Sequence, residues 1–294
     1  MSATQDEKLV SRFEKMPIGT RKSLIQIGST VTFEFQRNLK NMFISLGIAV
    51  GIYLLSLIIN LVQEGRGAES PATAGEYAIG YLNFIGFFIL IIAVMFGGSI
   101  IALDYDKQTG NLIFPKIAKG RLFIGRLIAR YVLSALAVIV YYVLTGVTTV
   151  IKYGELPIEI WSSLGWALLY TFLVLSLVVF FSSFMKKTST TIVVSLVIIL
   201  MVFNLIDVLL LISGVEIEPL YILTYYERII TAIFNMPTER FVEGTLGGPG
   251  PGMEGPSIMQ WLTPSMTGAA VGMLVYSAIL LTAAYFLFRR RQQK

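Results

Sequence analysis

Six long stretches of the chain are almost entirely apolar and are separated by more polar segments. Each stretch has about 20 residues or more, the length that an α-helix needs to cross the hydrocarbon core of a bilayer. The pattern therefore predicts an all-α integral membrane protein with six transmembrane helices. A soluble fold would have nowhere to bury six such helices in succession. We expect the spans at residues 42–62, 79–103, 127–151, 164–184, 191–212 and 266–288.

Basic residues are concentrated in alternate connections between these spans. Most of the 23 Lys and Arg residues lie in residues 1–40, 104–130, 186–187 and the tail 289–294. The exceptions are Arg66, Lys152, Arg228 and Arg240. Because basic residues of short connections remain on the cytoplasmic side, we expect both termini in the cytoplasm. The predicted location is the cell (plasma) membrane, with multiple passes.

The segment before the first span, residues 1–41, has two parts. Residues 1–19 are charged and contain helix breakers, which is typical of a flexible lead-in. Residues 20–41 mix apolar and basic residues, which favours an amphipathic helix on the inner leaflet. A plain extension of the first span is the alternative. We expect no cleavable signal peptide, because the first apolar run is too long for one.

The connection between the last two spans, residues 213–263, is the longest one on the outer side. Apolar residues recur at helical spacing over residues 221–234, which predicts a helix in the outer leaflet or over the bundle. The Gly- and Pro-rich tract GTLGGPGPGMEGPS follows, and we expect no regular structure there. The next residues, IMQWLTP, are expected to turn back toward the membrane.

Asn204 and Asp207 are the notable polar residues within the spans, and their spacing of three places them on one helix face. An acidic residue within a membrane is costly, so the pair is a possible intramembrane polar site. One hypothesis is an ATP-independent ion-coupled transporter or channel in which Asp207 titrates. An interfacial acid, or a hydrogen bond between helices, explains the pair equally well.

The residue inventory excludes several kinds of catalytic site. The chain contains no Cys and no His, so Cys/His metal sites, disulfides and catalysis by either side chain are excluded. No phosphate-binding G-x-x-x-x-G-K-[ST] motif, dinucleotide fingerprint, H-E-x-x-H motif or lipase elbow occurs. We therefore expect no catalytic residues, no metal site and no cofactor in this chain, and a transport or anchoring role rather than an enzyme.

The connection between the second and third spans contains more than a polar loop requires. Residues 103–126 read LDYDKQTGNLIFPKIAKGRLFIGR. Asp104 and Asp106 end the second span, and a Thr-Gly pair and an apolar turn come before Pro115. We expect a short amphipathic turn, a break, and a new helix from Lys119, which together project as a knob. Contacts with anionic lipid headgroups would explain the basic residues, but not the Thr-Gly pair or the apolar turn.

This segment resembles the signature of ABC-2 type transporter permeases, the six-helix membrane subunits of ABC exporters, and looks especially like archaeal members. In that family an acid ends the second span, and a Thr-Gly pair, an apolar turn, a Pro-x-Ser-Arg-like element and a Gly-Lys follow. Asp104 or Asp106 matches the acid, Thr109-Gly110 the pair, and Leu112-Ile113-Phe114 the apolar turn. Residues 116–119 stand at the third element, and Gly125-Arg126 at the Gly-Lys. Pro115 falls earlier than the family's proline, and the segment is slightly shorter.

The resemblance implies a permease subunit that moves a substrate outward. The knob would be a coupling helix seated on a separate ABC ATPase subunit, present in two copies, which binds ATP and Mg²⁺. A second, identical permease copy and membrane lipids are the other expected partners, with no nucleic acid. An apolar turn would bury in a cleft while basic residues pair with an acidic rim. The expected ATPase-coupling residues are Asp104, Asp106, Thr109, Gly110, Leu112, Ile113, Phe114, Lys116, Lys119 and Arg121.

Overall fold

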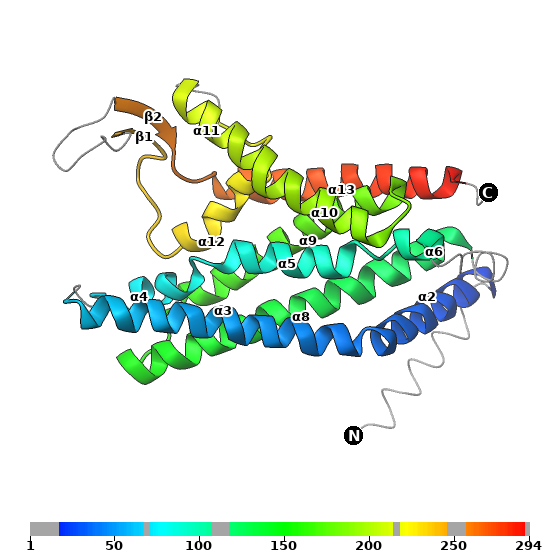
Figure 1. The fold of residues 1–294 in the computed structure, drawn as a ribbon, viewed down its shortest axis with the longest axis horizontal. Coiled ribbons are helices and arrows are strands. Elements are labelled where there is room, and N and C mark those ends of the chain that lie inside the picture. The colour runs from blue at the N-terminus through cyan, green and yellow to red at the C-terminus, as the bar shows by residue number, and fades with distance from the viewer. Residues whose placement is uncertain (1–17, 68–70, 107–117, 214–217, 246–256, 292–294) are drawn as a thin grey trace.

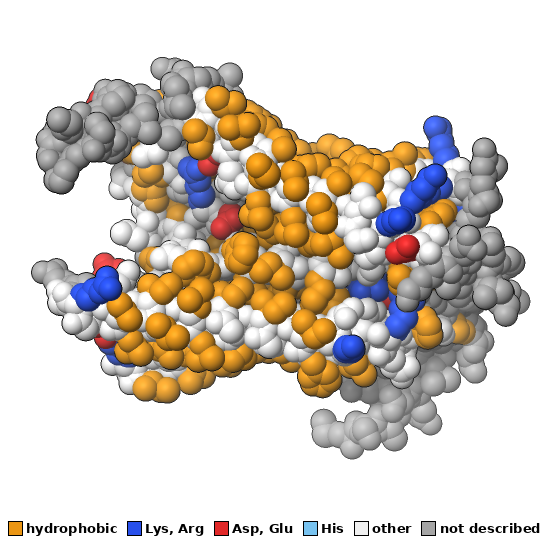
Figure 2. Space-filling view, in the orientation of Figure 1, with side chains coloured by type: hydrophobic (Ala, Val, Ile, Leu, Met, Phe, Trp, Pro, Cys, Tyr) orange, Lys and Arg blue, Asp and Glu red, His pale blue; other side chains and the backbone are white. Residues whose placement is uncertain are grey.

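The computed structural model describes residues 18–67, 71–106, 118–213, 218–245 and 257–291. Within these ranges, 6 helical segments are long and apolar enough to cross a membrane. They form one elongated bundle (Figure 1), and the face shown in Figure 2 is largely hydrophobic. The predicted all-α membrane fold with six spans is therefore confirmed.

The six spans follow one another along the chain. They are α3 (Leu39–Gly65); α4 (Ala74–Leu82) with α5 (Ile85–Gly97); α8 (Lys119–Tyr153); α9 (Glu159–Phe184); α10 (Thr188–Val197) with η1 (Ile198–Phe203) and α11 (Asn204–Ser213); and α13 (Met266–Arg290). The shorter elements are α2 (Ile18–Arg37), α6 (Ala102–Asp106), η2 (Thr224–Glu227), α12 (Arg228–Ala232), β1 (Phe241–Thr245) and β2 (Ser257–Trp261). Helix α2 begins and α13 ends at the same end of the bundle, here called the terminal end (Figure 1). The strands and the last turns of α11 lie at the opposite end.

Helix α9 lies at the centre of the bundle and contacts α5, α8 and α13. Its sequence is almost wholly apolar, and its buried hydroxyl groups bond within the helix; Thr171, for example, donates to the carbonyl oxygen of Ala167 at 2.7 Å. The first and fifth spans are peripheral, with only 17% and 11% of the residues in their most apolar windows buried. They therefore present long apolar faces to the outside of the bundle.

The second span is interrupted between α4 and α5. The sequence predicts one helix over residues 79–103, whereas the structure leaves Asn83 and Phe84 outside both helices. The interruption frees the carbonyl oxygen of Tyr81, which accepts a hydrogen bond from the hydroxyl of Tyr141 at 2.6 Å. A side chain of α8 thus supplies the bond that the helix lacks, as buried backbone requires in a membrane.

A second interruption follows at residues 98–101, between α5 and α6. Ser182 of α9 lies against this turn, and its hydroxyl oxygen accepts from the backbone N–H groups of Ile101 at 3.1 Å and Ala102 at 3.0 Å. The same hydroxyl donates to the carbonyl oxygen of Gly98 at 3.2 Å. One serine therefore satisfies the turn and fixes the position of α6 relative to α9.

The fifth span contains a π-helical turn, η1, between α10 and α11. A π-helix bonds each residue to one five positions away, so such a turn inserts an extra residue into an otherwise α-helical segment. The segment nevertheless continues as one span over Thr188–Leu210. Asn204 is the first residue of α11 after this turn.

Helix α2 packs against α8 and is joined to α3 by Asn38 alone. Gly125 of α8 permits the close approach, because a Cβ there would lie 2.8 Å from the Cβ of Thr30. Thr30 and Glu34 of α2 are buried, and so is Asn38 after its end. A helix covers most of the predicted residues 20–41 and is separated from the first span only at Asn38, and its placement on the inner leaflet stays a prediction.

The segment before the last span is partly helical, as residues 221–234 predict. Tyr225 and Tyr226 of η2 and Ile229 and Ile230 of α12 are buried. The antiparallel pair β1–β2, however, is not predicted. The Gly- and Pro-rich tract, expected to lack regular structure, has its first and last residues within these strands, and its residues 246–256 lie outside the described ranges.

Candidate functional site

The predicted coupling residues fall into two groups. Asp104, Asp106, Lys119 and Arg121 lie within the described residues. The others lie outside them: Thr109, Gly110, Leu112, Ile113, Phe114 and Lys116, together with Pro115. The structure therefore shows how the two ends of the connection are held. It gives no placement for the predicted apolar turn.

Asp104 belongs to a buried charge cluster at the terminal end. The cluster consists of Glu34 from α2, Asp104 from α6, and Arg126 and Arg130 from α8, each no more than 3% exposed. Arg126 binds both carboxylate oxygens of Asp104, one of them through Nη2 at 2.9 Å. Its Nε donates to Glu34 Oε1 at 3.1 Å, and Nη1 donates to the carbonyl oxygen of Ile100 at 2.9 Å. Arg126 thus connects three segments that are far apart in the sequence.

Glu34 is shared between several cationic groups of the cluster. Its Oε2 lies 3.2 Å from Nη2 of Arg130. Arg37, which is partly exposed, places its Nη2 at 2.7 Å from Oε1, and Asn38 Nδ2 donates to Oε2 at 3.3 Å. The fully buried part of the cluster holds two carboxylates and two guanidinium groups, so its charges balance. Such balance is what permits ionised groups in a low-dielectric interior.

The sequence contains a signal for this cluster. The signal is lost when the basic residues are used only to predict membrane orientation. Arg126 and Arg130 lie one helical turn apart at the start of an apolar span, so they share a face of α8. The sequence predicts a role for Arg126 only as a match to the Gly-Lys of the family. It predicts one for Arg130 only as a basic residue of the connection. Glu34 is the one acid in the predicted amphipathic helix. Its pairing with Arg126 spans 92 positions, which no local pattern reveals.

The other described coupling residues bind neighbouring helices at the terminal end. Arg121 Nη1 donates to Gln26 Oε1 of α2 at 2.6 Å. Lys119 Nζ donates to the carbonyl oxygen of Arg291, after the end of α13, at 3.0 Å. Asp106 is exposed and accepts from the backbone N–H of Thr188, the first residue of α10, at 3.4 Å. The ends of the connection are therefore attached to α2, α10 and α13.

Arg291 closes this end of the bundle from the side of α13. Its guanidinium stacks on the ring of Tyr105 at 3.7 Å and donates to the carbonyl oxygens of Ser183 at 3.0 Å and Met185 at 2.9 Å. Burial lowers the pKa of Arg291 and raises the pKa of Tyr105. The C-terminal end of α13 is thus tied to α6 and to the end of α9.

Asn204 and Asp207, the predicted polar pair, line a pocket of about 360 Å³ toward the opposite end. The pocket lies between α4–α5, η1–α11 and the η2–α12 segment, and Figure 2 shows a hollow with charged walls at this end. Asp207 forms an ion pair with Arg228, whose Nη1 donates to the carbonyl oxygen of Trp261 at 2.7 Å. The structure therefore brings Asn204 and Asp207 together at one pocket and pairs Asp207 with a cation.

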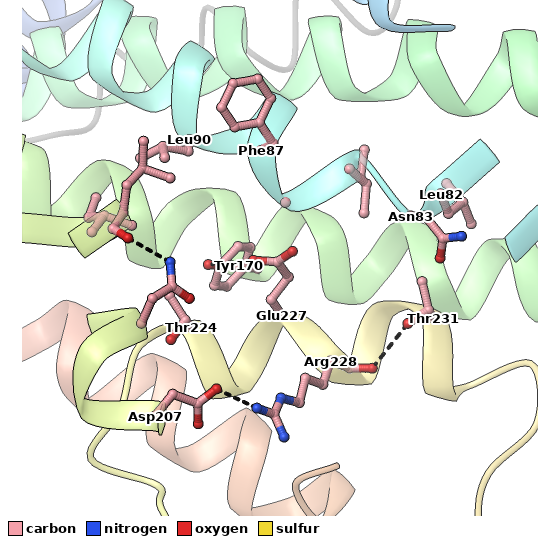
Figure 3. Close-up of a pocket in the computed structure, with 15 residues that line it drawn as sticks. Leu82, Asn83, Phe87, Leu90, Tyr170, Asp207, Thr224, Glu227, Arg228 and Thr231 are labelled. Carbon is pink, nitrogen blue, oxygen red and sulfur yellow. Dashed lines mark hydrogen bonds and ion pairs between the residues drawn. The ribbon is translucent and has the colours of Figure 1, made fainter. Parts of the chain in front are cut away.

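Glu227 is a second acid of this pocket and is absent from the sequence-based expectations. Its carboxylate lies against Gly86 of α5 and accepts a hydrogen bond from Tyr170 Oη of α9 at 3.3 Å. Figure 3 shows Glu227 beside Tyr170. Burial raises the pKa of Glu227. The available signal was a single acid within the apolar helical pattern of residues 221–234. Among the described residues, no group of three or more acidic side chains is placed to hold a metal ion.

Comparison with known proteins identifies one family. A family model described as "ABC-2 family transporter protein" matches residues 22–292, which is nearly the whole chain. The matched range includes every described span, the buried charge cluster and the pocket at the opposite end. No curated protein matches the chain significantly.

Proposed function

Because the chain belongs to the ABC-2 family of transporter proteins, we propose that it is the permease subunit of an exporter driven by a separate ATPase. The family and the six spans make it a multi-pass membrane component of an ABC-type transporter. The proposal adds the outward direction, coupling through residues 104–121, and an assembly of two identical permeases with two ATPase subunits. It also places the terminal end in the cytoplasm, as the distribution of basic residues predicts.

The observation that carries the coupling proposal is the buried charge cluster. Asp104 lies at the start of the connection, in α6, and Arg126 lies on the first turns of α8, the helix that ends it. Their ion pair joins the two sides of the connection, and Glu34 joins both to α2. A movement imposed on the connection by an ATPase would therefore move α6, α8 and α2 together.

The rest of the terminal end supports transmission into the membrane. Helix α8 is a 35-residue helix that runs from the connection through the third span, so displacement of its first turn reaches the opposite end. Lys119 and Asp106 link the same connection to α13 and α10. In this proposal ATP binding draws the two ATPase subunits together, and the attached helices rearrange to open an outward path.

The chain contains no Cys, so single-cysteine variants provide a direct test. We would convert Lys116 to Cys in the connection and, as the matched control, Lys152 to Cys at the other end of α8. Both would be expressed in native membranes with a cysteine-directed photo-cross-linker. We expect Lys116→Cys to capture a chain with a nucleotide-binding P-loop, and Lys152→Cys not to do so. Absence of any ATPase from the Lys116→Cys products, and from the protein purified in mild detergent, would refute the proposal.

The same two variants test the orientation. A membrane-impermeant maleimide added to intact cells should label Lys152→Cys but not Lys116→Cys, and permeabilisation should expose the latter. Labelling of Lys116→Cys in intact cells would reverse the proposed orientation and place the connection beyond the reach of a cytoplasmic ATPase.

A further inference from the structure

The pocket at the opposite end is lined by both apolar and charged side chains. Leu90, Ile199 and Leu200 are among the apolar residues, and Asp207, Glu227 and Arg228 are the charged residues among those that line it. Two acids and one base leave the lining with a net negative charge. A volume of about 360 Å³ is within the range that small organic ligands occupy. These features favour a ligand that combines a cationic group with an apolar body.

The two acids of the pocket are in different electrostatic situations. Arg228 is directed toward Asp207, away from Glu227, although it is the next residue in the chain (Figure 3). Within the described residues, Glu227 has no ion-pair partner, and Tyr170 is its only hydrogen-bond donor. Arg228 therefore neutralises Asp207 and leaves the charge of Glu227 without a protein cation in contact.

The fold makes specific room for this carboxylate. A Cβ at position 86 would lie 1.8 Å from Cδ of Glu227, so only glycine permits the observed position of the acid. Gly86 is in the first turn of α5, where the helix dipole favours a negative charge. No backbone N–H of α5 in the described structure donates to Glu227, so the acid does not cap this helix. The arrangement holds an ionisable group at the cavity with one hydrogen bond, from Tyr170, and without an ion pair in the described structure.

Additional acceptors lie near this group. Asn204 lines the pocket and donates its amide nitrogen to the carbonyl oxygen of Leu200 at 2.8 Å, a bond that does not use its amide oxygen. Asn83 also lines the pocket and is exposed. An ammonium group has three N–H donors and no acceptor, so it suits one carboxylate and neighbouring amide oxygens. An anion would meet two carboxylates with a single arginine that is already paired.

We propose that this pocket binds an organic ammonium ion attached to an apolar group, with Glu227 as its counter-ion. If the proposed transport function is correct, lipophilic amines are the substrate class. Only this assignment of the ligand as a transported substrate rests on the proposed function. Binding itself requires the pocket alone. A bound cation would also stabilise the ionised form of a carboxyl whose pKa burial raises.

The test uses the full chain with its co-purifying partners in lipid nanodiscs. The probe is dansylcadaverine, a primary ammonium on an apolar fluorophore, and its N-acetyl derivative is the uncharged counterpart. Binding is followed by fluorescence polarisation. We expect the ammonium probe to bind at least about tenfold more tightly than the acetylated one, since a charge-assisted hydrogen bond is lost. Equal affinities, or no binding of the ammonium probe, would overturn the proposal.

Two pairs of variants assign the effect to the pocket. Glu227→Gln keeps the side-chain shape and removes the charge, and Glu239→Gln, at an exposed position of the same outer segment, is its control. Gly86→Ala displaces the carboxylate, and Gly165→Ala, where an added Cβ meets nothing within 4 Å, is its control. We expect the two pocket variants to lose the preference for the ammonium probe, and both controls to retain it. A preference that survives in Glu227→Gln would contradict the proposal.

Acidification of the wild-type protein provides a test that does not depend on a variant folding. The charged and titratable groups near Glu227 are Tyr170 on α9, Arg228 on its own segment and Asp207 on α11. Binding needs ionised Glu227, so it should be present above the pKa of that group and be lost as pH falls through it. Because that pKa is raised, the loss should occur at a higher pH than for an exposed carboxyl. Binding that is independent of pH down to the range of ordinary carboxyls would refute the role of Glu227.

The outcome is separable from that of the proposed function. Recovery of an ATPase without charge-dependent probe binding would leave the permease proposal in place and reject this inference. Charge-dependent binding without an ATPase would support this inference and reject the permease proposal. The chain would then be an amine-binding membrane protein with another mechanism.

Discussion

Removal of the charge of Glu34 should be among the most destabilising single changes at the terminal end. Glu34→Gln keeps the size of the side chain and one acceptor oxygen, but removes the negative charge that Arg126 and Arg130 contact at 3.1 and 3.2 Å. Asp104 still neutralises Arg126 after the change. Arg130 does not have a second acid within the described residues, so it becomes an unpaired charge that is 1% exposed.

The magnitude follows from that unpaired charge. Loss of one partner of a buried ion pair costs about 3–5 kcal/mol. With about 2–4 °C of Tm per kcal/mol for a chain approaching this size, the expected decrease is roughly 6–20 °C. The assay is thermal unfolding in mild detergent at a fixed scan rate, followed by the fluorescence of the 3 Trp residues. Glu64→Gln is the control, since its pair with Lys152 is partly exposed and should contribute less than about 1 kcal/mol.

A second change gives the reasoning a sharper test. Arg130 has two buried nitrogen atoms, Nε and Nη1, without a hydrogen-bond partner in the described structure. Arg130→Met removes these together with the charge, so alone it should cost less than Glu34→Gln. Combined with Glu34→Gln, it should recover about 1–3 kcal/mol, a coupling typical of groups in contact. If the double variant is no more stable than Glu34→Gln, or if Glu34→Gln resembles the Glu64→Gln control, an unpaired Arg130 is not the cause of the instability.

Two further predictions concern the central helix and the pocket at the opposite end. Ser182→Ala leaves the backbone groups of the turn at residues 98–101 without their partner. It should lower the free energy of unfolding by about 1–3 kcal/mol in the same thermal assay. An unchanged Tm would mean that other groups satisfy this turn. Asp207→Asn should leave ATP-dependent transport of the cationic probe measurable in proteoliposomes, because the ion pair with Arg228 is partly exposed and its removal is tolerated. Complete loss of transport would instead support the hypothesis of an ion-coupled transporter.

The membrane architecture could be predicted because it depends on local composition. A helix that spans a bilayer must be apolar over its whole length, so each of the six segments is recognisable without its neighbours. The interruptions of the second span could not be predicted in the same way. The interruption after Leu82 is compensated by Tyr141, and the turn after Gly97 by Ser182, and both partners lie in other spans. An apolar window is equally compatible with a straight and a broken helix.

The candidate sites show the same division. Asp104 and Asp207 are identifiable as acids at or within a span, whereas Glu34 acquires its role only when α2 packs against α8. Glu227 is similar, because its position depends on the absence of a side chain at Gly86, more than a hundred residues earlier. The hairpin was missed for a local reason. Glycine and proline in the intervening tract indicate a loop, but they do not show that the residues on either side pair as strands.

The π-helical turn η1 determines the direction in which Asp207 points. Each residue of an α-helix advances the side-chain direction by about 100°, and the extra residue of a π-helical turn shifts everything after it by about that amount. The side chains of α11 therefore point in directions different from those expected if α10 and α11 formed one continuous α-helix. The meeting of Asp207 with Arg228 depends on the number of residues in η1 rather than on which residues they are. Among relatives, a change of length within residues 198–203 would alter this pocket more than most substitutions in its wall.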